Sequence, residues 1–485
     1  MLQVVNHGVS FCRRCVVKLR RGAFEILQRL FAEEWFSEFM VRMGTASGGL
    51  VPLLARMNGW IREEPLPPPF GPSPQKKRSA PNHTIRNRKT PVESERRSVL
   101  LLHHSYYHFK YLAEALRKRG WDAMSVTQLS PDEPSNQFFT GEDLNLYDPD
   151  PLIFRRKRDD FYNTISERFS MVFFSGIYWM GFYEENFFPK VPWDFMKLKS
   201  KGTKIGYVVT GCQDGVRQTE VERTTGGLCR KCVWQLHPEV CSNNLNARWG
   251  NRLEQMCDFI SLETDWATPP RNGPRYFPEP LTSCLDPNTW APDIEVPENL
   301  RFSRKPGELI VMHSVGNYET RAARGRDIKG SGAVFEAIKR LQSEGMPVRL
   351  EFATKVPNSD MRYLQVQADV IVDQLNYGRH GATTRQALML GRPVITKLTQ
   401  GNSEGVRALR SLSECPAVSA GEDDIYDALK ALLLSPDKRA RLGQEGREYA
   451  MRWLSADVCA ARFERVYDRV MAGQRFRDVQ MTDSK

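Results

Sequence analysis

The sequence has no long hydrophobic run, and this absence limits what the protein can be. No segment approaches the roughly eighteen consecutive apolar residues expected of a membrane-spanning helix. The start of the chain, MLQVVNHGVSFCRRC, also lacks the apolar core and small-residue cleavage site of a secretory signal. With 485 residues the chain can build two sizeable cores plus an extension. We therefore expect a cytoplasmic protein, attached to the inner face of the membrane peripherally if at all.

Aromatic residues are missing where the positive charge is concentrated. Of the formal net charge of +11, residues 73–97 supply 8 − 2 = +6, from eight Lys or Arg and two Glu. Surfaces that stack nucleic-acid bases interleave aromatic rings with cations, so we expect no specific nucleic-acid partner. A basic segment rich in proline is typical of a solvated tether. The alternative is a weak attraction of residues 22–97 to anionic lipid headgroups.

The chain begins with an extension, residues 1–62, followed by a basic Pro-rich linker, residues 63–96. Apolar side chains near helical spacing predict an amphipathic helix over Gly22–Met43, which would dock on the main body or on a membrane. Cys12 and Cys15 form a CxxC pair, but no second pair is near, so the metal signal there is weak.

Regular α/β patterning begins at residue 97. Short apolar runs over 98–102, 171–174, 204–209 and 259–262, with an amphipathic helix over Tyr107–Arg119, predict a doubly wound domain over 97–295. His103 and His104 follow the first run, at the end of a strand where catalytic groups collect. The two histidines could equally be residues of the turn after the strand, with no catalytic role, and the sequence leaves both interpretations open. Pro278–Pro297 reads as a turn-rich hinge.

A Cys-rich insert interrupts this domain at residues 211–241. Four sulfurs, those of Cys212, Cys229, Cys232 and Cys241, lie close together in a chain where disulfides are disfavoured. They suit a tetrahedral structural zinc site, with His237 as an alternative fourth ligand. The other interpretation is four reduced thiols that are partly packed.

A second α/β domain is predicted over 296–472, followed by a tail over 473–485. Within it, residues 368–396 read as strand, turn, helix and strand, with Asp373 closing the first strand and Gly381 opening the helix. Backbone N–H groups at such a helix start, aided by the hydroxyls of Thr383 and Thr384, attract a diphosphate. Upstream, the strand over 308–312 leads into a loop with Gly316 and four cations, among them Arg326 and Lys329.

This segment, residues 307–397, resembles the donor-binding domain of the group 1 glycosyltransferases (glycosyltransferase family 4), which have two Rossmann-like domains facing across a cleft, the GT-B architecture. The resemblance rests on Arg326, Lys329 and Gly330, on the turn Gly378–Gly381, and on the sequence Gln386-Ala-Leu-Met-Leu-Gly-Arg-Pro393. It implies a nucleotide-sugar donor, no catalytic metal, retention of configuration, and a glycan or lipid-linked acceptor in bacterial glycan synthesis. Some members carry a similar Cys-rich insert.

Two positions depart from the family pattern. Gly378 and Gln386 stand where the family has a pair of glutamates, one facing the sugar and one holding the ribose hydroxyls. An amide offers one acceptor oxygen and one donor group, so Gln386 keeps a weaker form of the ribose contact. Asp373 and His380 are candidate replacements for the carboxylate at 378. The alternative to a transferase is a non-catalytic homologue that binds nucleotides or acts as a scaffold.

Overall fold

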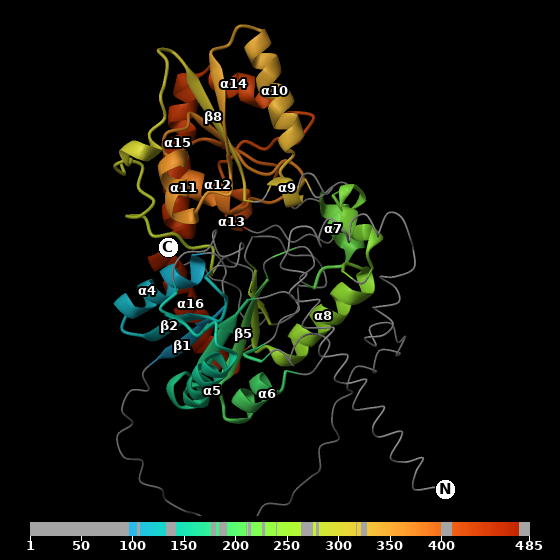
Figure 1. Cartoon of the computed structure of the whole chain (residues 1–485), viewed down its shortest axis with the longest axis vertical. Helices are drawn as coiled ribbons and strands as arrows, with labels where there is room; N and C mark the ends of the chain where they lie inside the picture. Colours follow the sequence, from blue (N-terminus) through green and yellow to red (C-terminus); the bar gives the residue numbers. More distant parts are fainter. Residues whose placement is uncertain are drawn as a thin grey trace, which may run out of the picture. The chain divides into compact units, whose positions relative to one another are not determined.

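The structure is a computed structural model of the chain (Figure 1). The chain divides into two units, Met1–Arg88 and Lys89–Lys485, and only the second contains described residues. The predicted helix Gly22–Met43 and the basic linker therefore lie outside the description, and the predicted domain boundaries stay predictions. The described residues are 97–103, 107–131, 142–175, 181–183, 192–209, 211, 215–225, 228–238, 240–262, 275–277, 281–316, 318–321, 327–398 and 410–474.

Seven parallel strands form the first sheet, in the order β3-β2-β1-β4-β5-β6-β7. Every residue of β1 and β4 is buried, which is the near-continuous apolar pattern of strands covered on both faces. The strand order reverses beside β1, as in a doubly wound sheet. The strands are β1 (Ser98–Leu102), β2 (Asp122–Thr127), β3 (Leu144–Asn145), β4 (Met171–Phe174), β5 (Lys204–Val209), β6 (Phe259–Leu262) and β7 (Tyr276–Phe277).

Helices connect these strands, and two of them, α5 and α8, begin at a residue whose side chain caps the helix. The Asp150 carboxylate accepts from the N–H groups of Leu152 and Ile153, and Pro151 takes the first helical position, so α5 starts there. Ser242 caps α8 in the same way. The elements are α4 (His108–Lys118), α5 (Pro151–Arg168), α6 (Trp193–Ser200), α7 (Gln218–Thr225), η3 (Cys229–Lys231), η4 (Val233–Leu236) and α8 (Asn243–Met256).

The second sheet has four parallel strands in the order β11-β10-β8-β9. Figure 1 shows α10 and α14 side by side next to β8, where their apolar faces bury the sheet. The elements are η6 (Glu298–Leu300), β8 (Leu309–Val315), α9 (Tyr318–Arg321), α10 (Ser331–Ser343), β9 (Val348–Thr354), α11 (Asn358–Gln365), β10 (Val370–Val372), α12 (Ala382–Met389), β11 (Val394–Ile395), α13 (Arg410–Ser413), α14 (Ile425–Leu433), α15 (Pro436–Leu454) and α16 (Ala456–Met471).

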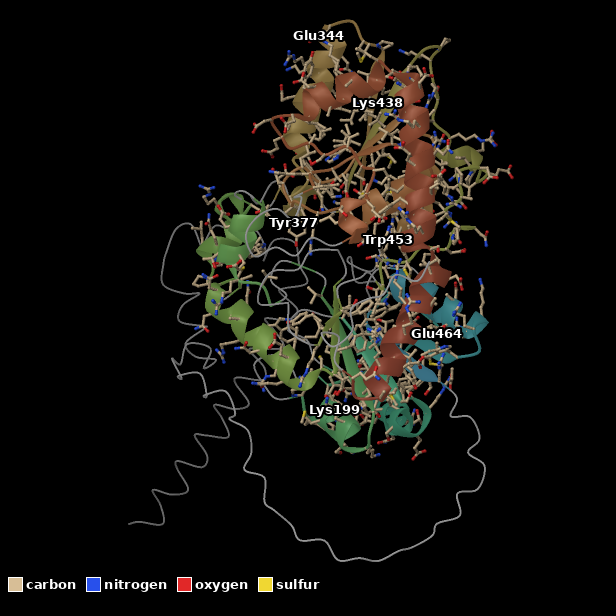
Figure 2. The ribbon with its side chains drawn as sticks, turned by 180° about the vertical axis from the view of Figure 1, so that it is seen from behind. Lys199, Glu344, Tyr377, Lys438, Trp453 and Glu464 are labelled. Carbon is tan, nitrogen blue, oxygen red and sulfur yellow. The ribbon has the colours of Figure 1, made fainter. Side chains whose placement is uncertain are left out.

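The last helix, α16, returns to the first half of the chain and packs against α4. The Trp121 ring lies 4.7 Å from that of Tyr467, and its indole N–H donates to Glu464 of α16 at 2.8 Å (Figure 2). Phe463 and Val466 of α16 therefore belong to the same buried cluster as Val99 of β1.

The predicted fold class, an α/β chain with two doubly wound Rossmann-like halves, is confirmed. The strands predicted in the first half all form, and the helix predicted over Tyr107–Arg119 spans His108–Lys118. Within the described ranges, no helix has both the length and the apolar character needed to cross a membrane.

Candidate anion-binding site

The predicted donor site lies where two neighbouring strands end. Because β8 and β10 are parallel and adjacent, their carboxyl ends meet at one edge of the sheet, where open α/β sheets bind ligands. Asp373 directly follows β10, and Lys329 precedes α10. The helix α12 begins after Gly381, so three separate segments bring polar groups to this edge.

The carboxylate of Asp373 is the centre of this site. One oxygen accepts from the Lys329 ammonium in a short ion pair. The other accepts from the N–H of Gly381 at 3.0 Å, and from the N–H and hydroxyl of Thr384 at 3.1 and 2.6 Å. Lys329 also donates to the Thr383 hydroxyl at 3.3 Å. The structure thus brings five predicted site residues together: Lys329, Gly381 and Thr384 donate to Asp373, and Thr383 accepts from Lys329.

This environment keeps Asp373 ionised although it is completely buried. Burial alone would raise the pKa of the carboxyl, but the Lys329 charge and the hydrogen bonds from Lys329, Thr384 and Gly381 lower that pKa below its usual value. The surrounding donors therefore stabilise the negative charge of the buried Asp373 carboxylate.

His313 on β8 supports the segment that leads from Lys329 into α10, a role that no sequence pattern indicated. Burial, opposed by a backbone hydrogen bond, lowers the pKa of His313 to about 4, so the ring is neutral near pH 7. A carbonyl can only accept, so Nδ1–H donates to Val372 O at 2.9 Å and Nε2 accepts from the Ser331 hydroxyl at 2.9 Å. Asp327 accepts from the N–H groups of Gly330 and Ser331 at 2.8 and 2.9 Å and caps α10.

The two departures from the family pattern have structural reasons. Gly378 has a φ of +74°, a left-handed conformation that a side chain such as glutamate adopts only at a cost. Gln386 is buried, and its amide is used inside the protein. It donates to the Tyr107 hydroxyl at 2.9 Å and accepts from the Gln365 amide at 3.0 Å. Its predicted ribose contact stays a prediction, and in this structure the amide serves packing between α12, α11 and the start of α4.

The remaining predicted site residues are placed as follows. His103 is buried at the end of β1 with a φ of +66°, and its Nε2 lies 3.0 Å from the Gly181 carbonyl. Gly316 follows β8, and its carbonyl accepts from the Lys355 N–H at 3.1 Å. His104 and Arg326 lie outside the described residues, so their predicted roles stay predictions.

Three of the four predicted zinc ligands line one pocket. Cys229, Cys232 and Cys241 border it together with apolar groups, and the Cys241 sulfur accepts from the Gln218 amide at 3.3 Å. The fourth, Cys212, lies outside the described residues. In the part of the chain that the structure describes, no cluster of three or more His, Cys, Asp or Glu has the arrangement of a metal site. The zinc site therefore stays a prediction.

The Cys-rich insert packs against the turn of the second half. Val221 and Leu228 of the insert share a buried apolar cluster with Tyr377, and Ile328 packs against the same cluster. Tyr377 is in the turn before α12 (Figure 2) and accepts from Arg379 at 2.6 Å. Composition gave no signal for this contact, because it joins segments that are distant in sequence.

The chain therefore has an α/β fold with two doubly wound parallel sheets. No family model and no curated protein matches the sequence. Among solved structures, the chain is similar to a sucrose-phosphate synthase from Thermosynechococcus elongatus, with 13% identity, 78% of this chain and 100% of that chain covered, and a TM-score of 0.47.

Two further solved structures are similar to the same degree. WaaG, described as a glycosyltransferase involved in lipopolysaccharide biosynthesis, has 12% identity, 78% and 100% coverage, and a TM-score of 0.45. HepE of Anabaena, in complex with UDP and glucose, has 9% identity, 76% and 99% coverage, and a TM-score of 0.45. Because these TM-scores are below 0.5, the fold is assigned from the strand order of the two sheets and from their helices.

Proposed function

We propose that this protein is a glycosyltransferase that moves a sugar from a nucleotide-diphosphate donor to a hydroxyl of a glycan or lipid-linked acceptor. The observation that carries the proposal is the placement of the Lys329 ammonium and the Thr383 hydroxyl beside the start of α12, at the carboxyl ends of β8 and β10. Cationic and hydroxyl donors at this edge suit a phosphate group.

The chemistry follows from charge. When the bond between the sugar and the diphosphate breaks, negative charge grows on the leaving oxygen, and fixed donors in a site shielded from water stabilise it. In this proposal Lys329, with Arg326 of the same loop, supplies that stabilisation, so the reaction needs no catalytic metal. The acceptor hydroxyl approaches from the first half, where His103 and His104 follow β1, and the product retains the anomeric configuration.

A panel of nucleotide sugars tests the proposal. The full chain is incubated with uridine-, guanosine-, adenosine- and thymidine-diphosphate sugars, and release of the nucleotide is measured beside binding by calorimetry. We expect release from at least one donor, and a loss of about tenfold or more in Lys329→Met, because a charged hydrogen bond to phosphate disappears. Lys438→Met, a change on α15 (Figure 2), is the control for loss of a surface charge.

One observation favours a second candidate function. The Gln386 amide is used between Tyr107 and Gln365, and Gly378 carries no carboxylate, which suits a homologue that binds nucleotides without turnover. Measurable nucleotide binding with no release from any donor would support this scaffold function. Absence of both binding and release would reject both candidates.

A further inference from the structure

The amide groups expected to hold a phosphate are already used by the protein itself. The N–H groups of Gly381 and Thr384 both donate to Asp373, and the Thr384 hydroxyl donates to the same oxygen. A ligand could reach these donors only if the Asp373 carboxylate left its place. Whether the Asp373 carboxylate stays in place during binding therefore decides which groups contact the ligand.

The surroundings of Asp373 indicate that it stays. Its side chain has no exposed surface, and its two oxygens accept four hydrogen bonds from Lys329, Gly381 and Thr384, one at the first oxygen and three at the second. Rotating the carboxylate outward would break all four bonds at once. It would also leave a buried helix start without acceptors, and such a helix end is costly.

Lys329 is the member of the pair that reaches the surface. The Lys329 side chain is 10% exposed to solvent, whereas the Asp373 side chain is 0% exposed. The ammonium has three hydrogens, of which one is directed at Asp373 and one at the Thr383 hydroxyl, 3.3 Å away. The Thr383 hydroxyl lies 3.3 Å from the Ser314 hydroxyl at the end of β8, so Thr383 links the ammonium to that strand.

We propose that Asp373 is a positioning residue, which stays bound to the start of α12 and holds Lys329 in place. The Lys329 ammonium and the Thr383 hydroxyl then contact the phosphate. The N–H groups of Gly381 and Thr384 do not contact it. This inference rests on the proposed function and states which groups carry the binding. Asp373 acts through Lys329, because their ion pair fixes the ammonium against the helix start. It makes no contact with the ligand itself.

Calorimetry with inorganic pyrophosphate on the full chain tests the inference by a double-mutant cycle. Lys329→Met should weaken binding by about tenfold or more, since a charged hydrogen bond is lost. Asp373→Asn should weaken it to a similar extent, because the ammonium loses its anchor. The double variant should bind no more weakly than Lys329→Met alone, since the two residues act as one unit.

A milder variant covers the case in which Asp373→Asn fails to fold. Thr384→Val keeps both charged partners and removes one donor to the carboxylate. It should weaken pyrophosphate binding by about twofold to fivefold, in line with the loss of one neutral donor, and Thr384→Ser should recover most of that loss. Folded Thr384→Val protein that binds as the wild type would contradict the inference.

The outcomes separate the inference from the proposed function. Tighter binding by Asp373→Asn would show that the carboxylate competes with the ligand, and additive losses in the double variant would show that it acts independently of Lys329. Either result overturns the positioning role while the wild type still binds nucleotides. A wild-type chain that binds neither pyrophosphate nor any nucleoside diphosphate would reject the proposed function, and the inference would fall with it.

Discussion

The contact between α15 and α12 depends on two glycines, and substituting them gives a sharp test of the structure. A Cβ atom on Gly443 would lie 2.3 Å from the backbone carbonyl oxygen of Gly391, just after α12. A Cβ atom on Gly446, one turn later on α15, would lie 2.9 Å from Leu388 Cδ2. The first neighbour is backbone and cannot turn aside, whereas the second is the end of a flexible side chain.

The two alanine substitutions should therefore differ although they share one helix. In a helix interior alanine is favoured over glycine by about 1 kcal/mol, and this gain is the same at both positions. Overpacking costs about 1–3 kcal/mol, or more where the backbone must move. We expect Gly443→Ala to lower the free energy of unfolding by about 2 kcal/mol, whereas Gly446→Ala should stay within about 1 kcal/mol of the wild type.

The effect should extend to the anion site. Arg447 on the same helix donates to the Met389 carbonyl at the end of α12 and to the Trp290 carbonyl at 2.9 Å. A shift of α15 would therefore move α12, whose first turn contacts Asp373. Urea unfolding followed by tryptophan fluorescence measures the stabilities, and calorimetry measures pyrophosphate affinity. Equal stability of Gly443→Ala and Gly446→Ala would refute the close approach of α15 to Gly391.

Two further predictions concern buried polar groups. Asp373→Asn should lower the free energy of unfolding by about 3–5 kcal/mol at neutral pH, because Lys329 loses its buried partner. The pKa of Asp373 is lowered in the folded state, so this contribution is present above the unfolded pKa and is lost as the pH falls through the folded pKa. In urea titrations from pH 7 to 3, the difference between the proteins should shrink below about pH 4. A constant difference would argue against an ionised Asp373. Gln386→Glu, which introduces a carboxyl group at this buried position, should destabilise the protein by about 1–3 kcal/mol. The loss should increase as the pH rises, because burial raises the pKa of the introduced carboxyl. An effect independent of pH would contradict the burial of this position.

The sequence alone determined the fold class and the elements that carry the site. Apolar runs such as Ser98–Leu102 and Val370–Val372 indicated strands covered on both faces, and in the structure every residue of both strands is buried. The glycine before α12 and the two threonines in its first turn marked a helix start beside a strand end, because backbone N–H groups without partners are a local property. Lys329 was named from sequence only as a cation of the upstream loop, and in the structure it donates to Thr383 in the first turn of α12.

Tertiary structure alone decided how those groups are used. The pairing of Lys329 with Asp373, 44 positions apart, depends on two strands ending at one sheet edge, and so the helix start that looked open in sequence is filled by a carboxylate. Gln386 meets Tyr107 across 279 positions, a contact that no local pattern encodes. Such bonds follow from which surfaces pack together, and packing is decided by the whole chain, whereas strand and helix starts follow from the residues beside them.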